Sequence, residues 1–126
     1  MWKQLSKLEQ LLMDHVWAHP DCTADACQQA LAAASRPLKD STVRTLLHRL
    51  EVKGYVTHRV SGRTYIYRAS KPRNKVAAQA VRQIVDRFCD GSMEQLLVGM
   101  VDNDFLSQHE LQQLARRIDL AKKERM

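Results

Sequence analysis

The chain of 126 residues lacks the features that mark several large classes of protein. It has no apolar run of about 18 residues, and its first residues lack the apolar core of a signal peptide. We therefore expect a cytoplasmic protein that does not bind membranes directly. A Gly-rich phosphate loop, a His-Glu-x-x-His motif and a nucleophile elbow are also missing from the sequence. The sequence thus predicts no enzyme and no cofactor.

Cysteine is scarce, and the odd set of Cys22, Cys27 and Cys89 argues against a disulfide framework in such a chain. Cys22 and Cys27 have neighbours with which a metal site could be drawn: His15, His19, Asp21 and Asp25. The C-x4-C spacing without a second ligand pair is a weak metal motif. We expect buried or incidental cysteines and predict no metal site.

Positive charge, in contrast, is in excess, with a formal net charge of +6. Between residues 36 and 68, eight Lys or Arg residues stand against only Asp40 and Glu51, whereas residues 71–126 carry ten basic and eight acidic residues. The excess thus lies on one segment, as a polyanionic partner requires. The hydrophobic content of 44% excludes wholesale disorder, and the length allows one modest domain, or a small domain with an added oligomerisation segment.

Residues 40–53 predict a helix with two different faces, capped by Asp40 or Ser41 and stopped by Gly54. An apolar stripe at i, i+3, i+4 and i+7 consists of Val43, Leu46, Leu47 and Leu50. The opposite face mixes short hydrogen-bonding side chains with arginine, which suits a major groove, where Arg reads guanine and Ser or Thr reads either base. We predict a recognition helix at about 41–53 with these DNA-binding residues: Ser41, Thr42, Arg44, Thr45, His48 and Arg49.

A β-hairpin is predicted next, because residues 55–60 and 64–69 are rich in Tyr, Val, Thr and Ile and flank Gly62. Its basic side chains could reach phosphates beside the groove: His58, Arg59, Arg63 and Arg68, of which Arg59 and Arg63 are assigned to DNA binding. A helix followed by a basic wing at about 55–69 is the winged-helix arrangement. The alternative is an ordinary amphipathic helix followed by a solvated hairpin.

Two further helices are predicted before the recognition helix. Ser6 with Glu9 forms a capping box at the start of the first, and Thr23 can cap the second, over about 24–34. Three helices in this order predict a helix-turn-helix core. The fold class expected is therefore mainly α with a small β-hairpin, namely an N-terminal winged helix-turn-helix plus a C-terminal helical dimerisation region.

The character of the sequence changes after Pro72, and we place a domain boundary after Ser70. Residues 1–70 are the predicted winged-helix DNA-binding domain and residues 71–126 the predicted helical dimerisation region. Three short amphipathic helices within about fifty residues cannot bury their apolar side chains alone, so we expect a second copy to cover them. The predicted dimerisation residues are Val81, Ile84, Phe88, Leu96, Leu97, Met100, Val101, Leu111 and Leu114.

The function predicted from these features is that of a DNA-binding transcriptional repressor. A homodimer would place two recognition helices on a palindromic operator and block transcription by occupancy. Two alternatives stay open, since a fold does not fix a function. One is a winged-helix module for protein interaction, and the other is a regulator that senses a ligand or metal between the C-terminal helices.

Three segments of the sequence also resemble the penicillinase-repressor (BlaI/MecI/CopY) family of bacterial winged-helix regulators. They are STVRTLLHRLEVKGYV at 41–56, LSKLEQLLMDHVW at 5–17 and LLVGMVDNDFLSQHELQQL at 96–114. The resemblance implies an N-terminal winged helix that binds an operator and a C-terminal helical region that holds a dimer. Copper-responsive members end in a cysteine-rich tail, whereas this chain ends in RRIDLAKKERM, which argues against copper sensing.

The resemblance also bears on how repression is lifted. In the family's antibiotic-resistance repressors, a membrane sensor-protease pathway leads to cleavage between Asn and Phe in the dimerisation region. Gly99 and Met100 stand at the corresponding place in this chain, so the cleavage pair is missing. Either a protease partner has another specificity here, or the repressor answers to a different inducer.

Overall fold

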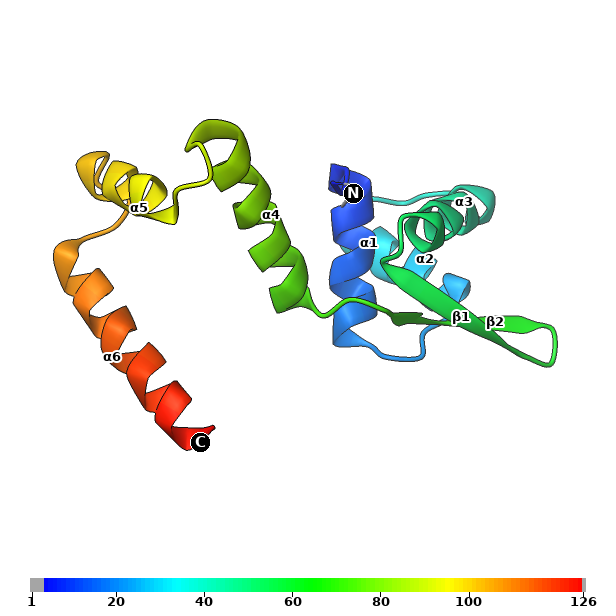
Figure 1. Cartoon of the computed structure of the whole chain (residues 1–126). Helices are drawn as coiled ribbons and strands as arrows, with labels where there is room; N and C mark the ends of the chain where they lie inside the picture. The colour runs from blue at the N-terminus through cyan, green and yellow to red at the C-terminus, as the bar shows by residue number, and fades with distance from the viewer. Residues whose placement is uncertain (1–3, 126) are drawn as a thin grey trace. The chain divides into compact units, whose positions relative to one another are not determined.

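The computed structural model describes residues 4–125, which form six α-helices and one antiparallel two-stranded sheet (Figure 1). In chain order these are α1 (Lys7–Ala18), α2 (Ala24–Ala33), α3 (Asp40–Val52), β1 (Val56–Ser61), β2 (Thr64–Ala69), α4 (Arg73–Phe88), α5 (Met93–Asp102) and α6 (Gln108–Glu124). This mainly helical architecture with a single hairpin confirms the predicted fold class. The chain divides into two compact units, Met1–Ala80 and Val81–Met126. Across residues 4–125, no helix is both long enough and apolar enough to span a bilayer.

The core of the first unit lies between α1, α2, α3 and the hairpin. The four residues of the predicted α3 stripe are all buried, as the 3.6-residue period requires. They pack in one cluster with Leu12, Met13, Val16, Cys27, Leu31, Tyr55, Val56 and Tyr67. The stripe therefore turns one face of α3 inward and leaves the opposite face on the surface.

Side-chain caps begin the first two helices as predicted. The Ser6 backbone N–H donates to Glu9 Oε1 over 2.8 Å, and the Glu9 N–H donates to Ser6 Oγ over 3.2 Å, completing the capping box. Thr23 Oγ1 accepts from the Ala26 N–H over 3.1 Å.

The predicted cap of α3 is wrong. Lys39 occupies the N-cap position, and among residues 4–125 its side chain makes no capping hydrogen bond. Asp40 lies inside the first turn, where a negative charge stabilises the helix dipole and can pair with a cation four residues later. That cation is Arg44, whose Nε lies 2.7 Å from Asp40 Oδ2.

The hairpin closes through a two-residue turn, because Ser61 pairs with Thr64 in the antiparallel register. Gly62 opens this turn with a φ of +64°, a conformation that suits glycine at the first position of a tight hairpin turn. The segment between α1 and α2 lies alongside β2. There the Cys22 N–H donates to the Tyr67 carbonyl over 3.0 Å, and the Tyr67 N–H donates back over 2.8 Å.

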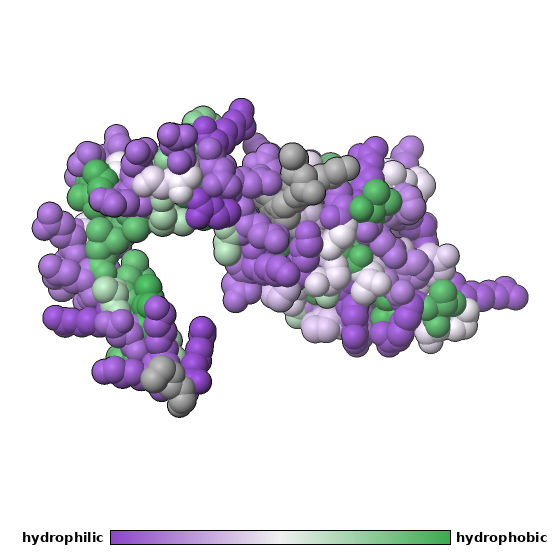
Figure 2. Space-filling view, viewed as in Figure 1, coloured by the Kyte–Doolittle hydropathy of each residue, from purple (hydrophilic) through white to green (hydrophobic). Residues whose placement is uncertain are grey.

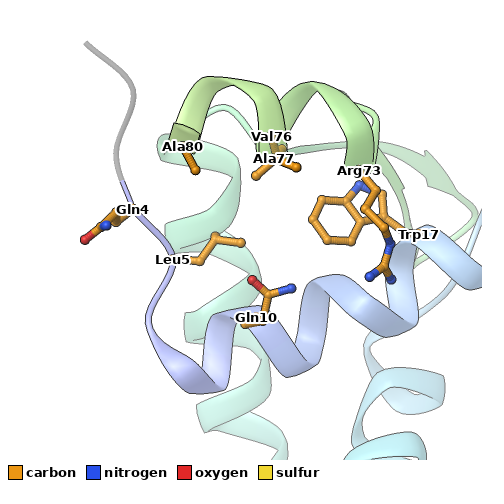
Figure 3. Close-up of a pocket in the computed structure, with 8 residues that line it drawn as sticks. All are labelled: Gln4, Leu5, Gln10, Trp17, Arg73, Val76, Ala77 and Ala80. Atoms are coloured by element: carbon orange, nitrogen blue, oxygen red, sulfur yellow. The ribbon is translucent and has the colours of Figure 1, made fainter. Parts of the chain in front are cut away.

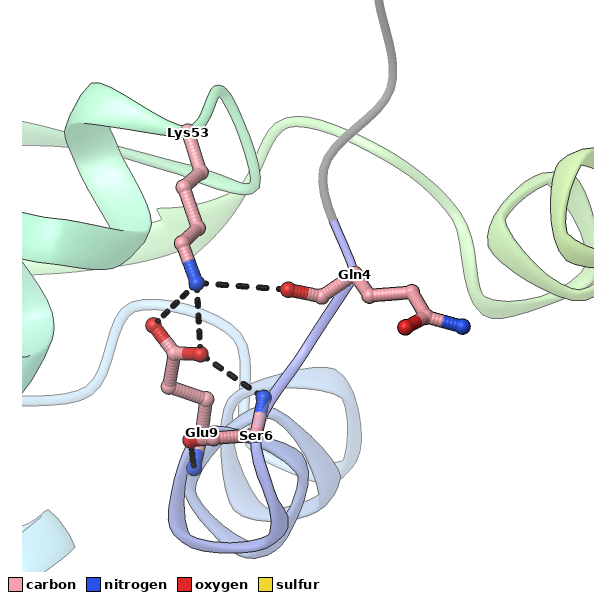
Figure 4. Close-up of polar contacts among 4 residues, drawn as sticks. All are labelled: Gln4, Ser6, Glu9 and Lys53. Carbon is pink, nitrogen blue, oxygen red and sulfur yellow. Dashed lines mark hydrogen bonds and ion pairs between the residues drawn. The ribbon is translucent and has the colours of Figure 1, made fainter.

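An ion pair joins the start of α1 to the end of α3 (Figure 4). Lys53 Nζ lies 2.7 and 2.9 Å from the two carboxylate oxygens of Glu9 and 3.2 Å from the Gln4 carbonyl oxygen. Glu9 is only 3% exposed. Burial by itself would raise the pKa of Glu9, but hydrogen bonds from Lys53 and Ser6 outweigh it, and the pKa is lowered. Helix α3 is therefore held at its C-terminal end by an ion pair with a buried carboxylate.

The start of α4 packs against α1 within the first unit. Trp17 Nε1 donates to the Lys71 carbonyl over 2.8 Å, the Arg73 guanidinium lies 4.8 Å from the Trp17 ring centroid, and Val76 is buried. A groove of about 520 Å³ runs along this contact (Figure 3), lined by Gln4, Leu5, Gln10, Trp17, Arg73, Val76, Ala77 and Ala80. The predicted domain boundary after Ser70 stays a prediction, and the first compact unit continues to Ala80.

The second unit consists of the end of α4 together with α5 and α6. Ser92 caps α5 by accepting from the Gln95 N–H, and Ser107 with Glu110 forms a capping box at the start of α6. As far as the structure describes them, α5 and α6 contain no fully buried residue. Apolar side chains gather on the surface where α5 meets α6 (Figure 2). This unit therefore leaves much of its apolar surface exposed to water.

Candidate nucleic-acid interface

The outward face of α3 carries all six residues predicted to read DNA. Each of Ser41, Thr42, Arg44, Thr45, His48 and Arg49 is exposed. The buried stripe on the other side of the helix holds the backbone in place, so these side chains are presented from a rigid element. Their exposure fits the predicted role, and their contacts with DNA stay a prediction.

Two of these side chains already have partners that affect what they can bind. Arg44 forms an ion pair with Asp40, which raises the pKa of its guanidinium, and its NH2 atom lies 4.0 Å from Asp25. The Thr45 hydroxyl donates to the Ser41 carbonyl over 2.9 Å. Because that proton is used within the helix, the Thr45 oxygen faces a groove as an acceptor, which suits a base amino group.

On the outer face of the hairpin, two wing arginines converge on one carboxylate. Arg59 NH1 lies 2.9 Å from Asp21 Oδ1, and Arg68 NH2 lies 3.1 Å from the same oxygen. Hydrogen bonds from Arg59 and then Arg68 lower the pKa of Asp21, whose side chain is 40% exposed. The wing charge is thus partly neutralised in the free protein. The sequence pattern did not indicate this contact, since Asp21 lies far from both arginines along the chain.

The other face of the hairpin is fastened to α3. His58 Nδ1 lies 2.7 Å from Glu51 Oε1, and the His58 ring stacks on Tyr65 with ring centroids 4.2 Å apart. His58, counted among the basic wing residues in the sequence, is therefore engaged inside the protein. Alternation along the strand explains this, because His58 points to the opposite face from Arg59. The contact fixes the orientation of the hairpin relative to α3.

Arg63 lies at the tip of the hairpin and is exposed. Within residues 4–125, neither Arg63 nor Arg49 forms an ion pair. These two guanidinium groups are thus available to an external anion without breaking an internal contact. The first unit combines an exposed helix face with a basic wing. In DNA-binding proteins, such a helix can contact bases in a groove while basic side chains contact the neighbouring phosphates.

Comparison with known proteins agrees with this geometry. The profile of the family described as Penicillinase repressor matches residues 5–120. The chain is 25% identical over 111 residues to the penicillinase repressor of Bacillus licheniformis, covering 88% of this chain and 86% of that protein.

Two solved structures are similar to part of this chain. The DNA-binding domain of the repressor BlaI aligns with a TM-score of 0.52 and 25% identity, over 60% of this chain and 90% of that one. The monomeric form of Bacillus licheniformis BlaI in complex with the blaP half-operator aligns with a TM-score of 0.50, at the same identity and coverage. The family profile spans most of the chain, so this protein belongs to the penicillinase repressor family of winged-helix, DNA-binding transcriptional repressors.

Proposed function

We propose that this repressor binds a palindromic operator as a homodimer, with α3 in the major groove and the wing on adjacent phosphates. The observation that carries the proposal is the two-faced α3. Its apolar stripe is buried, and its polar face, which includes Arg44 and Arg49, is exposed beside a basic hairpin. Repression follows from occupancy, because a protein on the operator excludes the transcription machinery.

The relative in complex with a DNA half-operator supports the first part of the proposal. One recognition helix covers few base pairs, so a single winged-helix unit meets half of a palindrome. Two units joined together bind both halves, and the second binding event then takes place at a high effective concentration. A dimer therefore binds much more tightly than either unit alone.

The apolar surface of the second unit supports a second copy of this chain as the partner. Of the predicted seam, Phe88 is 71% exposed, Leu114 47% and Ile84 45%. Val81 is also exposed, and the other predicted seam residues are partly buried: Leu96, Leu97, Met100, Val101 and Leu111. Contiguous apolar surface of this kind favours association.

The alternative of a ligand site has one observation in its favour. A groove of about 620 Å³ between α5 and α6 is lined by Glu94, Leu97, Val98, Val101, Asp102, Gln108 and Leu111. A second copy of the chain and a small apolar molecule would compete for these side chains. The oligomeric state of the full-length protein separates the two functions.

Substitution of the reading face tests the DNA-binding part. Arg44→Ala and Thr45→Ala should each weaken operator binding by roughly 1–3 kcal/mol, measured by fluorescence anisotropy on DNA selected by the wild-type protein. The matched control is Arg82→Ala, which also removes an exposed arginine paired with an aspartate four positions away on the same helix. Unchanged affinity in both α3 variants, or an equal loss in the control, would remove α3 from the interface.

Truncation tests the dimer. A chain ending at Ala80 keeps the packing of Val76 and the Trp17–Lys71 hydrogen bond, so we expect a folded monomer that binds a half-site weakly. Sedimentation of both forms, together with operator titrations, provides the measurement. A full-length monomer with full operator affinity, or a truncated chain that still dimerises, would contradict the proposal and favour the ligand groove.

Release from DNA would follow from loss of the dimer or of DNA binding. Gly99 and Met100 lie within α5, so a cut between them would divide that helix and separate α6 from the winged-helix unit. A protease needs extended backbone, and α5 would have to unfold locally before such a cut. We propose that a partner protease, if it acts here, recognises a sequence other than Asn-Phe.

A further inference from the structure

Three potential metal ligands from separate parts of the first unit meet beneath the wing. His15 comes from α1, Cys22 from the segment that pairs with β2, and Cys27 from α2. Their ligand atoms all lie within 4.8 Å of one another, and the two sulfur atoms are 3.8 Å apart. Cys27 is fully buried and Cys22 is 6% exposed. In the sequence, His15 is among the possible neighbours of Cys22 and Cys27, but no metal site is predicted, because the C-x4-C spacing lacks a second ligand pair and the third ligand comes from the preceding helix.

The imidazole of His15 has an unmet bonding requirement. Its Nε2 atom is buried, and among residues 4–125 it has no hydrogen-bond partner. Buried polar atoms in folded proteins nearly always have a partner, so such an atom calls for an explanation. The ring stacks on His19 with ring centroids 4.4 Å apart, which holds its plane. A cation bound between Nε2 and the two sulfurs would satisfy this nitrogen.

The donor set identifies the class of ion. Two thiolates and one imidazole are soft or borderline ligands, which bind zinc-like ions in preference to Mg²⁺ or Ca²⁺. In a tetrahedral site with Zn–S bonds of about 2.3 Å, the two sulfurs would lie about 3.8 Å apart, which agrees with the observed separation. Three protein ligands leave the fourth position to water or another small ligand. We propose that His15, Cys22 and Cys27 form a binding site for Zn²⁺.

The site joins the elements that support the wing. Cys22 exchanges two backbone hydrogen bonds with Tyr67 of β2, and the neighbouring Asp21 holds Arg59 and Arg68. An ion bound there would tie α1, α2 and the base of the hairpin together. Because ions that bind only the folded state stabilise it, occupancy should raise the unfolding temperature of the first unit.

Cobalt substitution provides the direct test. Full-length protein, reduced and stripped of metal, is titrated with Co²⁺, whose tetrahedral thiolate complexes absorb visible light. We expect one equivalent to saturate the band and Zn²⁺ to displace it. Cys22→Ser and Cys27→Ser should abolish the band, and His15→Gln should shift or weaken it. The matched control is Cys89→Ser. Cys89 lies in the second unit, so this substitution should leave the spectrum unchanged.

If Cys27→Ser fails to fold, the effect of Zn²⁺ on the thermal unfolding of the wild type and of Cys22→Ser provides a second test. Excess Zn²⁺, at about a hundred times the dissociation constant, should raise the unfolding midpoint of wild-type protein by roughly 10–20 °C. The shift should vanish in folded Cys22→Ser and persist in Cys89→Ser. Absence of a Co²⁺ band in the wild type, or a band lost in Cys89→Ser, would overturn the proposal. Loss of two free thiols on mild oxidation without any metal band would overturn it in favour of a redox pair.

Discussion

Replacing Lys53 by methionine should lower the free energy of unfolding of the winged-helix unit, because the buried carboxylate of Glu9 loses its partner. Glu9 is 3% exposed and the Lys53 side chain 24% exposed, and the shortest distance between their charged atoms is 2.7 Å. Removal of one partner from a buried pair typically costs 3–5 kcal/mol, and partial access of water to this site reduces that cost to roughly 2–4 kcal/mol. The penalty arises because Glu9 stays charged in an apolar setting.

The effect of Glu9→Gln on stability should have opposite signs in the wild type and in the Lys53→Met variant. Glu9→Gln retains the hydrogen bond from the Ser6 N–H and should destabilise the wild type, since Lys53 then loses its counter-charge. In the Lys53→Met background, however, Glu9→Gln removes an uncompensated buried carboxylate and should restore stability. Urea unfolding followed by tryptophan fluorescence measures this, because both tryptophans of the chain, Trp2 and Trp17, belong to the first unit and therefore report on its unfolding. If Glu9→Gln lowered the free energy of unfolding equally in the wild type and in the Lys53→Met variant, Glu9 and Lys53 would not be energetically coupled.

The pH dependence of these variants provides an independent check. In the wild type the folded-state pKa of Glu9 is lowered, so its contribution is complete above the unfolded pKa of about 4.3 and is lost as the pH falls through the folded value. Without Lys53, burial dominates and raises the pKa of Glu9 above the unfolded value. Protonation of Glu9 then removes its uncompensated charge in the Lys53→Met variant. The difference in free energy of unfolding between this variant and the wild type should therefore become smaller from pH 7 towards pH 4. A deficit independent of pH would show that lost packing, and not charge, is responsible.

Two further predictions concern the wing. Arg63→Ala should lower the slope of log affinity against log salt by about 1 and weaken binding to all DNA sequences alike, and salt titrations on operator and unrelated DNA measure both effects. A loss confined to the operator with an unchanged slope would mean that Arg63 reads bases. Asp21→Asn should release Arg59 and Arg68 and raise DNA affinity by roughly two- to fivefold at low salt, with Asp14→Asn, which frees Arg73 outside the proposed interface, as the control. Unchanged or weaker binding in Asp21→Asn would show that the carboxylate positions the arginines for DNA.

Local patterns in the sequence were sufficient to predict the helices, the hairpin and the outward face of α3. The stripe from Val43 to Leu50 and the caps at Ser6, Thr23 and Ser107 depend on neighbours within one or two helical turns. Such interactions can be inferred from spacing alone. The resemblance to the family also lies in local stretches, at 5–17, 41–56 and 96–114, and the family profile matches residues 5–120.

Contacts between residues far apart in the chain could be assigned only from the tertiary structure. Lys53 meets Glu9 across 44 positions, and Arg68 meets Asp21 across 47, so neither pair has a periodic signature. The same holds for His15 beside Cys22 and Cys27, where packing of α1 on α2 brings three soft ligands together. Side-chain chemistry and period determine which face of an element is buried, whereas the packing of elements determines which charged and ligating groups become partners.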